Sequence, residues 1–132
     1  VSEEMYIVRG LPGSGKSTFA EFLASTNTNS VIVEVDKIAF ENYGEWKQSL
    51  VSQYHKDAFK LFCESVDNSV ELIIVSNVNS SWIQFKEMYY YAEDNGYHVT
   101  SLITENRHES GSIHNVNEST YDGMRNKFSV VL

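Results

Sequence analysis

A glycine-rich segment near the start of the chain carries the residue types best suited to chemistry. It reads G-x-x-x-x-G-K-S-T in Gly10, Leu11, Pro12, Gly13, Ser14, Gly15, Lys16, Ser17 and Thr18. Glycines let backbone N–H groups turn inward around phosphate oxygens, because no Cβ stands in the way. In this pattern the lysine brings a mobile positive charge to the β- and γ-phosphates, and the serine hydroxyl binds Mg²⁺. The segment therefore predicts a nucleoside triphosphate site, with Lys16 at the phosphates and Ser17 at the metal.

A carboxylate follows the next apolar run of the sequence. Residues 30–35 are rich in β-branched side chains and predict a strand, and Asp36 comes directly after it. A carboxylate beside the phosphate loop can accept the proton of an attacking hydroxyl or hold Mg²⁺ through water. The alternative is a purely structural role, in which the Asp36 carboxylate caps the N-terminus of a helix. Of the two readings, the catalytic one is favoured for Asp36.

Two further segments have the right composition to line such a site. Residues 70–75 predict a buried strand, at whose end nucleotide hydrolases place a magnesium-binding aspartate. Here that place holds Ser76, a weak magnesium neutraliser, which argues against a strong stand-alone ATPase. Arg107 lies in a polar loop, residues 104–115, and is predicted to act as a lid arginine that meets charge on the transferring phosphate. A solvated surface arginine is the alternative.

The elements that must position these residues alternate along the chain. Strands are predicted at residues 5–9, 30–35, 70–75 and 97–103, and helices at about 17–25, 46–67, 80–95 and 117–127. Residues 128–132 are either a closing strand or an apolar tail. Such alternation predicts an α/β fold of three layers, α/β/α, around a parallel sheet of four to five strands. Ligands then bind at the carboxyl ends of the strands, where the phosphate loop and Asp36 fall.

Composition narrows the class of protein. With 132 residues and 42% hydrophobic content, the chain is expected to form one domain over residues 1–132. No apolar run is long enough to cross a bilayer, and a single cysteine allows no internal disulfide. A cytoplasmic setting is therefore expected, without a membrane partner. The net charge of −8 disfavours a surface that coats nucleic acid, although a local pocket for one strand end fits the composition.

With these residues in place, the chain resembles the polynucleotide-kinase-like P-loop kinases, among the zeta-toxin-like P-loop NTPases. The group is frequent in bacteriophages and their hosts, so a phage protein would work in the host cytoplasm. The resemblance covers nearly the whole chain and rests on residues 9–18, on Asp36, on residues 75–79 followed by Trp82, and on residues 106–108. It implies transfer of the γ-phosphate of ATP to a hydroxyl, often the 5′-hydroxyl of DNA or RNA. By the same resemblance Asp36 is the general base and Arg107 the lid arginine, with ATP and Mg²⁺ bound by the loop.

Two departures from the family pattern concern the acceptor. Polynucleotide kinases carry an arginine three residues after the catalytic aspartate, where this chain has Ala39, and an aspartate where it has Ser76. The two changes remove opposite charges together and indicate altered acceptor recognition. The acceptor therefore stays open among a nucleic-acid or nucleotide hydroxyl, a hydroxymethylated base in phage DNA and a small molecule. A hypothesis from another class is a slow or non-catalytic nucleotide-binding module that acts through a partner.

Overall fold

Strands and helices alternate along nearly the whole described part of the chain. The computed structural model describes residues 2–79 and 82–105. In chain order the elements are β1 (Glu4–Arg9), α1 (Lys16–Ser25), β2 (Ser30–Val33), α2 (Val35–Tyr43), α3 (Val51–Asp67), β3 (Leu72–Ser76), α4 (Lys86–Asp94) and β4 (His98–Ile103). Short 3-10 helices precede α3 and α4, at Gln48–Leu50 and Trp82–Gln84.

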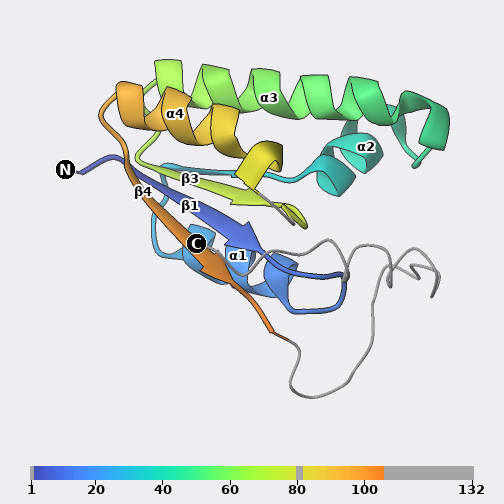
Figure 1. Cartoon of the computed structure of the whole chain (residues 1–132), viewed down its shortest axis with the longest axis horizontal. Helices are drawn as coiled ribbons and strands as arrows, with labels where there is room; N and C mark the ends of the chain where they lie inside the picture. The colour runs from blue at the N-terminus through green and yellow to red at the C-terminus, as the bar shows by residue number, and fades with distance from the viewer. Residues whose placement is uncertain (1, 80–81, 106–132) are drawn as a thin grey trace.

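The four strands form one parallel sheet in the order β2-β3-β1-β4. Parallel neighbours need crossover connections, and the helices supply them. Helix α1 lies on one face of the sheet, whereas α2, α3 and α4 lie on the other (Figure 1). The expected three-layer α/β/α architecture is therefore confirmed, with four strands in the part of the chain that the structure describes. Residues 128–132, the candidate fifth strand, lie outside the described residues.

The core is divided by the sheet into two apolar clusters. On the α1 face, Val8 and Ile74 pack with Ala20, and on the opposite face Ile7 and Val75 pack against α3 and α4. Successive residues of a strand point to opposite faces, so β1 and β3 feed both clusters. All of β3 is buried because helices cover both sides of it. This rigid centre carries the loops that begin where the strands end.

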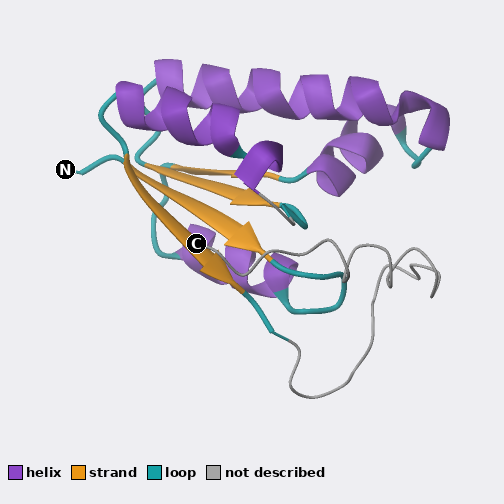
Figure 2. Ribbon diagram, viewed as in Figure 1, coloured by secondary structure: helices purple, strands orange, loops and turns teal. Residues whose placement is uncertain are grey.

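The region after β2 differs from the sequence prediction. The strand ends at Val33, and an unpredicted helix, α2, follows at once, so that Asp36 lies in its first turn and not at a strand end (Figure 2). Gly44 ends α2 in the left-handed region, with φ 78°. The next helix begins later than predicted, at Val51.

Candidate functional site

The phosphate loop has the backbone geometry that its sequence predicts. It connects β1 to α1, and Gly13 and Gly15 adopt φ values of 82° and 94°, which side chains disfavour. The N-cap residue of α1 is Gly15, which has no side chain to cap the helix, and the first turn of α1 contains no acidic residue. The first N–H groups of that helix therefore lie at the loop with their positive dipole end outward, an arrangement that suits a phosphate.

The ends of β3 and β4 brace the phosphate loop. The amide of Gly10 donates to the Val78 carbonyl oxygen at 3.3 Å, just after β3. The amide of Thr104, directly after β4, donates to the Arg9 carbonyl oxygen at 2.8 Å. The Thr104 and Ser14 hydroxyls share a hydrogen bond of 2.7 Å. Three strand ends thus fix the loop in one position.

Arg9, the last residue of β1, is fully buried behind the loop. Its Nε donates to the Asn79 carbonyl oxygen at 2.8 Å, and its guanidinium lies 5.0 Å from the centre of the Phe85 ring. Burial lowers the pKa of Arg9 below its ordinary value. Because Asn79 has a φ of 47°, a left-handed conformation, the bond from Arg9 helps to hold a strained turn after β3.

Lys16 and two carboxylates form the charged part of the site. The ammonium donates to the Leu11 carbonyl oxygen at 3.2 Å, which folds the side chain back over the loop. Burial lowers the pKa of Lys16, while the carboxylates of Glu34 and Asp36 act in the opposite direction. The positive charge therefore lies within electrostatic reach of both acids. Asp36 acts on Lys16 from the first turn of α2, and not from the end of a strand as the sequence analysis expected.

Ser17 contacts a carboxylate that the sequence analysis missed. Its hydroxyl donates to Glu34 Oε1 at 3.1 Å, from the first turn of α1 to the residue that follows β2. A serine hydroxyl beside a carboxylate is a pair of oxygen ligands of the kind that Mg²⁺ prefers, so these two residues fit the metal that the loop motif implies. Residues 2–79 and 82–105 contain no group of three or more histidine, cysteine, aspartate or glutamate side chains that could form a metal cage by themselves.

Asn77 fixes the start of α2 from the neighbouring strand. Its side-chain Oδ1 accepts a hydrogen bond of 3.0 Å from the Val35 amide, at the first residue of the helix. Asn77 therefore occupies the role of an absent N-cap side chain, because Glu34 at that position makes no capping bond. This tether sets where Glu34 and Asp36 stand relative to β3. Arg107, the predicted lid arginine, lies outside the described residues.

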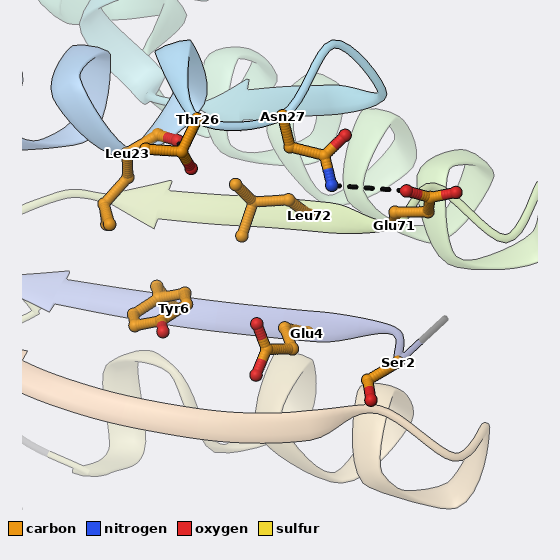
Figure 3. A pocket seen from close by; sticks show the side chains of 8 residues that line it. All are labelled: Ser2, Glu4, Tyr6, Leu23, Thr26, Asn27, Glu71 and Leu72. Atoms are coloured by element: carbon orange, nitrogen blue, oxygen red, sulfur yellow. Dashed lines mark hydrogen bonds between the residues drawn. The ribbon is translucent and has the colours of Figure 1, made fainter.

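A hollow on the protein lies away from the phosphate loop. It lies at the amino ends of β1 and β3, at the opposite end of the sheet from that loop, and Glu4 and Glu71 point into it (Figure 3). Asn27 donates to Glu71 at 3.2 Å there, and none of the described residues that line the hollow is basic. Two carboxylates repel phosphate, so this is not the nucleotide site.

None of the helices within the described ranges has the length and apolar content needed to span a bilayer.

Comparison with solved structures shows the same fold elsewhere. A chain of the Pnkp1/Rnl/Hen1 RNA repair complex matches with a TM-score of 0.70 and 22% identity, over 96% of this chain and 44% of its own length. Kti12 from Chaetomium thermophilum, in complex with ADP-AlF3, matches with a TM-score of 0.65 and 14% identity, over 95% of this chain and 80% of its own. An APS kinase from Mycobacterium tuberculosis gives a TM-score of 0.52 and 10% identity, over 96% of each chain.

These likenesses establish a P-loop kinase-like fold. The chain spans less than half the length of the RNA repair chain that it matches. No protein-family model matches the sequence. The phage origin and the cytoplasmic setting stay predictions.

Proposed function

We propose that this chain is a P-loop kinase that transfers the γ-phosphoryl group of ATP to a hydroxyl of a nucleic acid or nucleotide. The observation that carries the proposal is the position of Asp36 in the first turn of α2, close enough to Lys16 for its negative charge to counteract the lowering of that ammonium's pKa by burial. In many kinases a carboxylate close to the transferred phosphate accepts the proton of the acceptor hydroxyl. The presence of kinases among proteins of the same fold supports the proposal.

Each residue has a defined part in the proposed transfer. The loop amides and Lys16 hold the β- and γ-phosphates, and Ser17 provides a ligand for Mg²⁺, which when bound neutralises phosphate charge. Asp36 accepts the proton of the acceptor hydroxyl while the oxygen of that hydroxyl forms a bond to the γ-phosphorus. The bond from that phosphorus to the β–γ bridging oxygen breaks, and ADP leaves. Arg107 is proposed to meet the charge on the transferring group.

The acceptor side of the site differs from a polynucleotide kinase pattern. Ala39, where those enzymes have an arginine, lies on α2 with its side chain fully buried in the core. A side chain at this position therefore faces the interior, and an acceptor phosphate has to be recognised by other groups. This supports keeping nucleotides, hydroxymethylated bases and small molecules among the acceptors to be tested. ATP, in preference to GTP, is proposed from the family resemblance.

The direct test is phosphate transfer from γ-labelled ATP in the presence of Mg²⁺. The panel of acceptors contains hydroxyl-ended DNA and RNA, nucleosides and hydroxymethylated DNA. We expect label in one acceptor class. Label in no acceptor, with nucleotide binding intact, would instead favour the nucleotide-binding module.

Replacing the proposed base gives a residue-level test. We expect Asp36→Asn to keep ATP affinity within a few-fold while transfer falls by about 100-fold or more, the scale of a lost general base. The matched control is Asp94→Asn, because Asp94 is an exposed carboxylate at the end of α4. Calorimetry measures affinity and the labelled assay measures transfer. Unchanged turnover in Asp36→Asn would remove Asp36 from the mechanism.

A further inference from the structure

Glu34 has no part in the transfer described above, yet it contacts the serine of the phosphate loop. We propose that Glu34 supplies the carboxylate of the magnesium site, in place of the acidic residue that this chain lacks at the end of β3. The inference rests on the proposed function, because it assumes that a nucleotide and Mg²⁺ bind at the loop. It assigns Glu34 as a positioning residue for the metal and its waters, and it leaves the proton of the acceptor to Asp36.

The end of β3 cannot provide the carboxylate itself. Ser76 occupies the position where nucleotide hydrolases carry a magnesium-binding aspartate, and its side chain is only 1% exposed. Its Oγ has no hydrogen-bond partner within the described parts of the chain. The three residues that follow are Asn77, Val78 and Asn79, so no acid comes next either. A single hydroxyl is left where the metal site needs negative charge.

The sheet places Glu34 directly beside this gap. Strands β2 and β3 are neighbours, and Val33 pairs with Val75. The paired register ends there, but Glu34 directly follows Val33 with an extended backbone, φ −136° and ψ 125°, just as Ser76 directly follows Val75. We therefore infer that Glu34 lies next to Ser76. Ile74 packs on the α1 face, and side chains alternate along a strand, so Ser76 and Glu34 both face α1. A carboxylate close to the end of β3 therefore comes from the residue that follows the adjacent strand, β2.

Ser17 completes the arrangement from the start of α1. Its hydroxyl donates to Glu34 Oε1 at 3.1 Å, which leaves the lone pairs of the serine oxygen available to a cation. A carboxylate that accepts the proton of a metal ligand orients that ligand, and its other lone pairs can accept hydrogen bonds from metal-bound water. Mg²⁺ commonly keeps several waters and needs only one or two carboxylates besides phosphate oxygens. Glu34 therefore suits the role without a cage of acids.

The test measures how much Mg²⁺ strengthens nucleotide binding, independently of transfer. Calorimetry is run with the non-hydrolysable β,γ-imido analogue of ATP, once with MgCl₂ and once with EDTA, on wild type, Glu34→Gln and Glu41→Gln. Glu41 is the matched control, because it is a glutamate on the exposed side of α2 whose partner is Lys37 at 3.9 Å. Binding of Mn²⁺ to the protein–analogue complex, followed by electron paramagnetic resonance, gives a direct metal affinity.

We expect Glu34→Gln to reduce the Mg²⁺-dependent increase in affinity, and the Mn²⁺ affinity, by about 10- to 100-fold, the usual cost of losing an outer-sphere partner of a metal site. Binding in EDTA should stay equal or improve, because a negative charge near the phosphates is gone. Glu41→Gln should behave as wild type. If Glu34→Gln does not fold, Glu34→Asp keeps the charge with a shorter reach, and a smaller loss of Mn²⁺ affinity is expected.

The outcomes separate this inference from the proposed function. A full Mg²⁺ effect in Glu34→Gln, or in Glu34→Asp where that variant is used, overturns the role of Glu34 while nucleotide binding stands. A wild type that binds the analogue equally with and without Mg²⁺ also overturns it. A wild type that binds no nucleotide overturns the proposed function and this inference together. A lost Mg²⁺ effect in a protein that phosphorylates no acceptor supports Glu34 and refutes the kinase.

Discussion

Gly10→Ala should weaken nucleotide binding, because the added methyl group would displace the hydroxyls of Ser14 and Thr104. A Cβ at Gly10 would lie less than 3.0 Å from the side-chain oxygens of Ser14 and Thr104, and 3.2 Å from Cγ of Lys16. Since those two oxygens share a hydrogen bond of 2.7 Å, they cannot both stay in place. Losing that bond costs about 1 kcal/mol. Forcing a methyl group into a filled site costs about 1–3 kcal/mol more.

The sum is about 2–4 kcal/mol, and each 1.4 kcal/mol expressed in binding is about tenfold in affinity. We therefore expect Gly10→Ala to weaken ATP binding by about 30-fold or more in calorimetry. The control is Gly44→Ala: its Cβ meets nothing within 4 Å, but its φ of 78° is left-handed. That variant should lose about 1–2 kcal/mol of folding stability and keep its affinity. Affinity within about two-fold of wild type in Gly10→Ala would refute the packing argument.

Two further predictions concern the ammonium of the loop and a buried phenol. Lys16→Ala should weaken triphosphate binding by about 10- to 100-fold, the worth of a charged hydrogen bond, and equal affinity in calorimetry would contradict the phosphate-loop assignment. Burial raises the pKa of Tyr97 to about 12 from 10.0, and its hydroxyl donates to the Val70 carbonyl oxygen at 2.6 Å. The folded state thus holds the Tyr97 proton more tightly than the unfolded state. The contribution of Tyr97 to the free energy of unfolding is therefore complete below about pH 10 and is lost as pH rises towards about 12. Denaturant titrations across this pH range should show that the free energy of unfolding falls less steeply in Tyr97→Phe than in wild type. Equal slopes would show that Tyr97 does not cause the loss of stability.

The sequence was most informative where a local motif determines local structure. Gly13, Gly15 and the strand–loop–helix context predicted the phosphate loop, and alternation predicted the three layers. Helix α2 was missed because the β-branched run continues through Val35, and because the usual N-cap signal of serine, threonine, aspartate or asparagine is absent at Glu34. Here the cap comes from Asn77, 42 residues away in sequence. A tertiary contact of this kind is invisible to patterns that read only neighbours.

Glu34 and Thr104 were missed for a related reason. Each acquires its place from the order of the strands, which brings the ends of β2 and β4 to the loop after β1. The alternation of Ile32 and Glu34 was the one signal available, since it sets both side chains on the same face of an extended segment. This alternation places Glu34 near the end of β3 only if β2 is known to lie beside β3. Arg107 stays a prediction, because it lies outside the described residues.

The bare amino end of α1 has a consequence for the behaviour of the protein in solution. The N-cap residue is Gly15, which has no side chain to satisfy the first amides of this helix, so a bound polyphosphate would act as its cap. Folding and occupancy are then thermodynamically linked. Nucleotide at about one hundred times its Kd adds about 2.7 kcal/mol to the free energy of unfolding. The melting temperature of the protein should therefore follow the ambient nucleotide concentration, and the amount of folded protein in a cell should fall when that concentration falls.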